Sequence, residues 1–251
     1  MLNCVFTMNR LSVIQNIKQV ESKPYPHVIT YGALPEDIFQ ELQDTLPNDY
    51  VDSKPFSQVD PSQRIKWDTL VEDKWPISNI WKEFFEYHTS REYFDAVLNL
   101  FEPWAKKLKI PQDKIILDER NQKPMNTNCY TECQFVRHRV MENHQTTRTA
   151  HLDNPLEIYA GLLYFKHPND QSTGGGFNVH ESIERPQFDR KNNNEVKNPG
   201  PIAQTANYQS NMFAMFWNTF DSVHSVEPRI NAQHPRWSIN IIGRFNGTRM
   251  W

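Results

Sequence analysis

The chain has 251 residues and a mass of 29.7 kDa, enough to bury a substantial core within one domain. Its 27 basic and 30 acidic residues leave a formal charge of −3, which argues against nucleic acid as a partner. The mean hydropathy of −0.72 and the lack of a run of about 18 apolar residues argue against a membrane protein. Residues 1–10 show no basic segment followed by a long apolar one, so we expect no secretory signal and a cytoplasmic location.

Residues 1–110 have the patterns of a mainly helical region. At 35–46, Ile38, Leu42 and Leu46 recur every four residues behind Pro35, which predicts an amphipathic helix. Thr89 and Glu92 have the spacing of a capping box and predict the start of another helix, which carries the apolar residues up to position 101.

Residues 111–251 change character and favour β-structure. Short apolar runs separated by turn residues lie at 133–140, 157–165, 176–179, 212–217 and 237–242. Strands at this spacing predict an antiparallel sandwich or barrel, so we expect one domain over 1–251 of the α+β, mainly β class. The polar stretch 184–204 interrupts it and is interpreted either as a lid-like insert or as a mobile excursion.

The cysteines indicate neither disulfides nor a zinc site. Only Cys4, Cys129 and Cys133 occur, which is too few for a disulfide framework, and no second closely spaced pair completes a four-ligand zinc site. We interpret them as free thiols in a reducing compartment.

The residues that could carry out chemistry are His151, Asp153 and, far downstream, His224. Alternate residues of a strand point to the same side, so the side chains of His151 and Asp153 can meet one ion. Two histidines and one carboxylate leave three positions of an octahedron open, and this set is typical of non-haem Fe(II) oxygenases. An H-x-D pair alone is weak, but here Gly174, Gly175 and later Arg236-Trp-Ser238 accompany it.

The combined pattern resembles the Fe(II)- and 2-oxoglutarate-dependent oxygenases. It reads His151-x-Asp153, His224 and Arg236-x-Ser238, and the resemblance covers about residues 130 to 245. The segment HLDNP at 151–155 and the pair of glycines at 174–175 are similar to the prolyl-hydroxylase-like branch. The resemblance implies a double-stranded β-helix, a jelly-roll or cupin-like fold, over 111–251 with a helical layer before it.

The same resemblance implies roles for six residues. His151, Asp153 and His224 would bind Fe(II), and the far carboxylate of the cosubstrate 2-oxoglutarate would bind Arg236, with hydroxyl groups from Ser238 and Tyr164. O2 is the second cosubstrate. Arg229 is a rival for this carboxylate, but Arg236 begins an apolar strand and has Ser238 two residues on. The carboxylate at Asp153 argues for oxygen transfer or desaturation rather than halogenation.

Candidate substrate contacts are Arg137, Arg139 and Arg148, which precede His151 and suit an anionic group, and Trp217, which precedes His224. The resulting prediction is a dioxygenase that hydroxylates, desaturates or oxidatively cyclises a small polar metabolite, such as an amino acid or a natural-product intermediate.

Two alternatives stay open. One is a peptidyl or protein prolyl-type hydroxylase, which a long exposed groove beside the metal would favour, whereas a closed pocket lined by Arg137 or Arg148 favours a small molecule. The other is a cupin-like protein that binds a ligand without turnover. The sequence indicates no oligomeric state.

Overall fold

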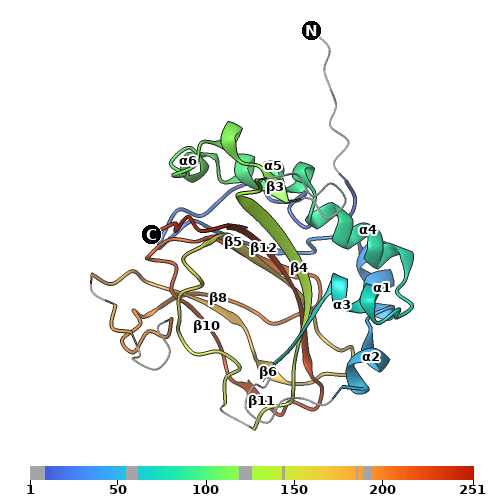
Figure 1. Cartoon of the computed structure of the whole chain (residues 1–251). Helices are drawn as coiled ribbons and strands as arrows, with labels where there is room; N and C mark the ends of the chain where they lie inside the picture. Colours follow the sequence, from blue (N-terminus) through green and yellow to red (C-terminus); the bar gives the residue numbers. More distant parts are fainter. Residues whose placement is uncertain (1–8, 55–61, 119–125, 143–144, 185, 189–193) are drawn as a thin grey trace.

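The computed structural model describes residues 9–54, 62–118, 126–142, 145–184, 186–188 and 194–251 (Figure 1). Its main feature is a large sheet with the strand order β1-β9-β5-β12-β4-β2, and the two-residue β3 pairs with β4 in parallel. The other neighbours in this sheet are antiparallel. The strands are β1 His27–Tyr31, β9 Met212–Trp217, β5 Glu157–Phe165, β12 Arg236–Phe245, β4 Cys129–His138, β2 Ser62–Lys66 and β3 Leu117–Asp118.

A smaller antiparallel sheet faces the large one and has the order β10-β7-β8. Its strands are β10 His224–Val226, β7 Phe177–His180 and β8 Ile202–Ala206. A further pair joins β6 Thr173–Gly174 to β11 Arg229–Ile230. The mainly β architecture predicted from the sequence is therefore confirmed, while the double-stranded β-helix and the single domain over 1–251 stay predictions.

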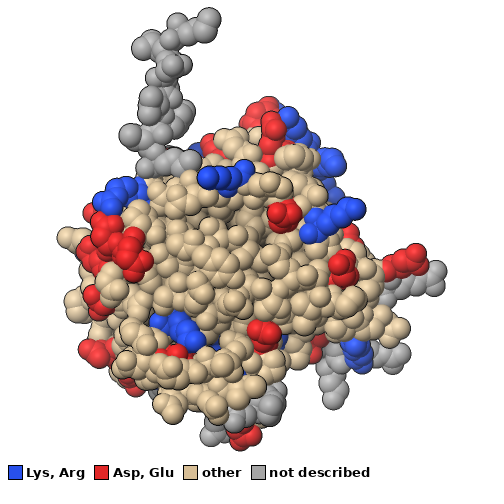
Figure 2. Space-filling model, turned by 180° about the vertical axis from the view of Figure 1, so that it is seen from behind, with Lys and Arg blue, Asp and Glu red and all other residues tan. Residues whose placement is uncertain are grey.

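Helices cover the opposite face of the large sheet (Figure 1). They are α1 Glu36–Asp44, α2 Asn48–Asp52, α3 Trp67–Glu72, α4 Asn79–His88, α5 Arg91–Leu100 and α6 Glu102–Ala105, followed by a 3-10 turn at Gln112–Lys114. None of the described helices is long and apolar enough to cross a membrane. On the face shown in Figure 2, charged side chains lie mostly around the margin of a largely uncharged centre, and neither sign forms a continuous area.

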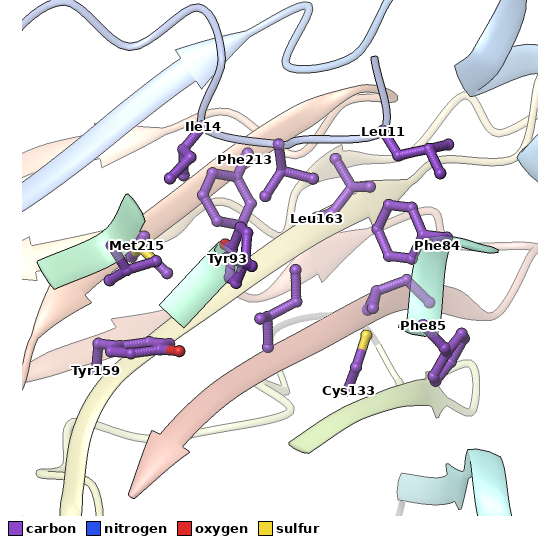
Figure 3. Packing of buried hydrophobic residues seen from close by; sticks show 14 of the residues in the cluster. Leu11, Ile14, Phe84, Phe85, Tyr93, Cys133, Tyr159, Leu163, Phe213 and Met215 are labelled. Carbon is purple, nitrogen blue, oxygen red and sulfur yellow. The ribbon is translucent and has the colours of Figure 1, made fainter. Parts of the chain in front are cut away.

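Alternation along the strands gives the large sheet two different faces. On β12, Ile239 and Ile241 belong to the core beneath the helices, whereas Ser238 and Asn240 point to the other side and line a cavity between the sheets. Figure 3 shows the helix-side core, in which Phe84, Phe85 and Tyr93 pack over strand residues such as Leu163. The central strands thus pack against the helices with one face and carry polar, cavity-lining side chains on the other.

The predicted strands 157–165 and 212–217 match β5 and β9, and the predicted helix 35–46 contains α1. Residues 1–110 also contribute two strands that the sequence analysis did not predict, because β1 and β2 form the edges of the large sheet. β2 was missed because its sequence SQRIK is polar and buries only Ile65.

The predicted capping box is displaced by one residue. Ser90, not Thr89, is the N-cap of α5, and its hydroxyl accepts a hydrogen bond from Tyr93 N at 3.2 Å. Thr89 instead ends α4, where its hydroxyl donates to the carbonyl of Phe85 at 2.8 Å.

Of the insert at 184–204, residues 185 and 189–193 lie outside the described part. The remainder contains a bridge between Phe188 and Val196 and most of β8, and its function as a lid stays a prediction.

Candidate active site

His151 and His224 lie directly opposite each other in an isolated antiparallel bridge. His151 N donates to His224 O at 3.0 Å, and His224 N donates to His151 O at 3.1 Å. The two imidazole rings are consequently 4.2 Å apart between centroids. Backbone pairing, rather than side-chain contact, brings these two distant residues together.

Asp153 completes a group of three. Its Oδ1 is 3.5 Å from His151 Nε2 and 3.7 Å from His224 Nε2, and one ligand atom from each residue lies within 4.8 Å of the others. In the described part of the chain, no other group of three His, Cys, Asp or Glu residues has this geometry. Two nitrogens and one oxygen are thus placed to share one ion.

Each histidine is fixed in the tautomer that a metal ligand needs. His151 Nδ1 lies 2.7 Å from the carbonyl of Thr149, and His224 Nδ1 lies 2.9 Å from that of Ser222. A carbonyl oxygen only accepts, so both Nδ1 atoms carry the proton and both Nε2 lone pairs are available toward Asp153.

The charges agree with this assignment. Burial, with the neighbouring His151, lowers the pKa of His224 to about 3, so its ring is neutral at physiological pH. Burial acts to raise the pKa of Asp153, but His224 and His151 bring it down to about 2. The side chain of His224 is also held by the rings of Phe216 and Phe177, at 4.5 and 5.3 Å. A neutral His224 beside an ionised carboxylate is a suitable set of donors for a divalent cation.

The three residues border a cavity of about 450 Å³ between the two sheets. Tyr164, Arg236 and Ser238 line it from the large sheet. Arg236 is only 2% exposed, and its guanidinium lies 4.4 Å from the ring centre of Tyr164. Its Nη2 donates to the carbonyl of Gly175 at 3.4 Å, and the hydroxyl of Ser238 donates to Asn240 Oδ1 at 3.3 Å.

On the large-sheet wall, the buried Nε of Arg236 and the buried hydroxyl oxygen of Tyr164 have no hydrogen-bond partner among the described residues. Buried polar groups are normally paired, so this pair of vacant donors on a cavity wall fits a carboxylate that binds there. The donors present therefore suit the far carboxylate of 2-oxoglutarate.

Arg229, the rival arginine, is engaged elsewhere. Its Nη2 lies 2.5 Å from Asp170 Oδ2, and its Nε donates to the hydroxyl of Ser172 at 3.2 Å. It does not line the cavity that contains the histidines. Its charge is neutralised inside the protein, which leaves Arg236 as the buried arginine on that cavity.

The four predicted substrate residues are not brought together. Arg148 lines the cavity, but Arg137 lies on the helix side of β4, paired with Asp52 at 2.6 Å. Arg139 borders a separate space of about 10 Å³. Trp217 is 3% exposed in the helix-side core, with its ring 5.7 Å from that of Phe101. Of the four, only Arg148 is placed to meet a molecule beside His151 and His224.

Sequence reasoning missed other polar residues of the same cavity, notably Arg64 on β2 and Glu157 at the start of β5. Burial raises the pKa of Glu157 to about 9, helped by the charges of Asp153 and Glu132, whereas Arg64 acts in the opposite direction. No motif indicates these residues. Only the pairing of β2 with β4 brings Arg64 to the cavity wall.

No protein-family model matches the chain, and no curated protein matches it. Among solved structures, the epimerase SnoN in complex with Fe3+, alpha ketoglutarate and nogalamycin RO is similar over 87% of this chain and 78% of that one. The TM-score is 0.51 at 9% sequence identity. A second SnoN structure, described as a non-heme alpha ketoglutarate dependent epimerase from nogalamycin biosynthesis, gives 0.50 at 11% identity over the same shares. The chain has the fold of this epimerase.

A prolyl-4-hydroxylase from Pseudomonas putida is also similar, with 15% identity over 88% of this chain and 93% of that one. Its TM-score of 0.43 is too low to support an argument about function. The similarity to SnoN therefore shows the fold, and the geometry of the cavity is the basis for the function proposed below.

Proposed function

We propose that this protein is a non-haem Fe(II)- and 2-oxoglutarate-dependent dioxygenase that oxidises a C–H bond of a small polar metabolite. In this proposal the two facing sheets form a double-stranded β-helix, as in the prolyl-hydroxylase-like branch. The observation that carries it is the convergence on one cavity of the His151, Asp153 and His224 ligand atoms with the unpaired donors of Arg236 and Tyr164. Neither half of this arrangement is explained by packing alone.

The three ligand residues would hold Fe(II) and leave three positions for cosubstrates. Iron held by these residues would activate O2, with 2-oxoglutarate as the source of two electrons. The hydrogen bonds from His151 and His224 to backbone carbonyls keep both rings oriented toward the ion. Asp153 contributes the carboxylate, and its presence favours oxygen transfer or desaturation over halogenation.

Arg236 would hold the far carboxylate of 2-oxoglutarate. Its planar fork matches a carboxylate, its burial excludes competing water, and the hydroxyls of Tyr164 and Ser238 lie on the same wall. The cosubstrate then extends from this arginine toward the three metal ligands. A cavity of about 450 Å³ lies within the usual range for small-molecule sites, which favours a metabolite over a protein substrate.

The test is replacement of Asp153 by Ala. We expect metal affinity to fall at least 100-fold, because one of three ligands and the only ligand charge are lost, and we expect 2-oxoglutarate-dependent succinate formation to disappear. Metal binding is measured by calorimetry with Mn(II) or Ni(II), and succinate by mass spectrometry. Asp221→Ala is the matched control, because Asp221 is an exposed carboxylate three residues before His224. Full retention of both properties in Asp153→Ala would refute the proposal.

A further inference from the structure

The edge strand β2 places a cation on the wall of the cavity. Arg64 pairs in register with Val136 of β4, and both residues line the cavity, whereas the next residue, Ile65, is buried on the helix side. Arg64 makes no hydrogen bond or salt bridge through its guanidinium within the described part of the chain. Its positive charge acts on Glu157 and lowers the pKa of that carboxyl, against the effect of burial.

Arg148 supplies a second cation on the same cavity. It is half-buried, and its backbone is fixed, because its carbonyl accepts from Val226 N at 3.0 Å and its N–H donates to the hydroxyl of Thr146 at 3.2 Å. Its guanidinium has no ion pair or hydrogen bond with a described residue. It is close enough to Asp153 and His224 to lower the pKa of both.

Glu157 places a carboxyl group without a partner on this wall. It is half-buried, and its carboxylate accepts no hydrogen bond and forms no salt bridge with a described residue, although its backbone carbonyl accepts from Asn218 Nδ2 at 3.0 Å. The neighbouring acid, Glu132, differs in this respect, because it pairs with Lys66 at 2.9 Å. A partly buried carboxyl without a partner is costly, and a bound cation would relieve that cost.

Two arginines outside this wall are neutralised inside the protein. Arg137 pairs with Asp52, and Arg229 pairs with Asp170. By contrast, Arg64, Arg148 and the carboxyl of Glu157 line the cavity that also carries the three candidate metal ligands, and none of them has an ion-pair partner among the described residues. Arg236 is assigned to the cosubstrate, so the cosubstrate does not account for Arg64, Arg148 and Glu157.

We infer that the substrate is a zwitterion, a small molecule with both an acidic group and an amine, as in a free amino acid or dipeptide. Arg64 and Arg148 bind its acidic group, and Glu157 binds its ammonium group. This inference rests on the proposed function, because it places the substrate beside the iron site. It goes further in fixing the charges that the substrate carries at each end.

The experiment uses a panel of free L-amino acids and dipeptides together with their N-acetyl and C-terminal amide derivatives. Binding is measured without O2 by calorimetry on the full chain loaded with Ni(II) and 2-oxoglutarate. Turnover is measured in a separate assay with Fe(II), 2-oxoglutarate and O2, as the succinate formed above the background without substrate. We expect at least one free zwitterion to bind and to stimulate succinate formation, and we expect its N-acetyl and amide forms to bind at least 10-fold more weakly.

Two variants test the individual charges through selectivity, which misfolding does not change in this way. Glu157→Gln should reduce the preference for the free amine over its N-acetyl form from at least 10-fold to below 3-fold. Arg148→Gln should do the same for the free acid over its amide. Glu132→Gln is the matched control, because this acid is already paired with Lys66, and it should keep both preferences.

The outcomes separate the two proposals. If the wild-type protein binds neither metal nor 2-oxoglutarate, the proposed function itself fails. If it binds both but no zwitterion in the panel binds, the inference about the substrate is overturned while the proposed function stands. Unchanged preferences in Glu157→Gln and Arg148→Gln would overturn it equally.

Discussion

Arg229 and Arg236 are both buried arginines downstream of His224, and their surroundings decide between them. Arg229 forms an ion pair with Asp170, whereas Arg236 faces the cavity with an unpaired Nε. The sequence indicated this choice through the offset of Ser238 and the apolar strand that follows. Burial and pairing now give it a physical reason, because a guanidinium in an internal ion pair has little left to offer a ligand.

Replacing Arg236 by Lys should weaken 2-oxoglutarate binding about 10- to 100-fold, because one charge-assisted hydrogen bond of a two-pronged contact is lost. Metal affinity should stay within about threefold, since the ligand residues are not altered. Calorimetry on the Ni(II)-loaded protein measures both constants. Arg229→Lys is the comparison, and a larger loss of 2-oxoglutarate affinity there would assign the carboxylate to Arg229.

The three candidate metal ligands could be predicted from the sequence, but the other polar residues of the cavity could not. His151, Asp153 and His224 can be recognised as a motif without knowing which face of a strand is buried. For Arg137 the buried face had to be known. Residues on both faces of β4 are buried, so alternation alone does not say which face meets the cavity. The structure puts Arg137 on the helix side.

At the scale of elements, short polar segments with long-range partners were the hardest to predict. β2 has a single buried residue, Ile65, and it forms by antiparallel pairing with the edge of the ten-residue strand β4. The two glycines at 174–175 were easier to single out, because they belong to the sequence pattern that carries the family resemblance. Both have positive φ, at +73° and +78°, and a side chain on Gly174 would meet the carbonyl of Pro228. The adjacent carbonyl of Gly175 accepts from Arg236, so this bend also positions the arginine.

The start of α5 allows a test at this scale. Ser90→Ala removes the hydroxyl that accepts from Tyr93 N and should destabilise the protein by about 1 kcal/mol. Ser78→Ala is the matched control, because Ser78 is the N-cap of α4 but its side chain makes no capping hydrogen bond. Urea unfolding of the three proteins measures the free energies of unfolding. Equal losses in both variants would contradict the assigned cap.

For the whole molecule, the large sheet joins two environments that the sequence could only partly distinguish. One face packs under helices from the first half of the chain, and the other faces polar chemistry assembled from the second half together with β2. Strand and helix periodicity predicted the mainly β architecture because it is local. The closing of the cavity by β2 depends on pairing across the chain, which no local pattern records.

The acid stability of the whole protein should depend on His88, which is fully buried in the helix-side layer. Its Nδ1 donates to the carbonyl of Phe84 at 2.7 Å, and its Nε2 accepts from Val13 N at 3.5 Å, so the ring is neutral. Burial lowers its pKa from 6.5 to about 3, and the unfolded chain therefore takes up a proton below pH 6.5 that the folded protein does not. The resulting contribution is absent above pH 6.5 and grows as pH falls toward 3, and it lowers the free energy of unfolding by about 1.4 kcal/mol per pH unit.

Urea unfolding at pH 7 and pH 5 tests this. Between these two pH values, the free energy of unfolding should decrease by about 2 kcal/mol less for His88→Gln than for the wild type. The comparison variant His167→Gln alters an exposed ring and should keep most of the wild-type decrease. An equal decrease in wild type and His88→Gln would show that His88 is not the buried neutral group that links folding to pH.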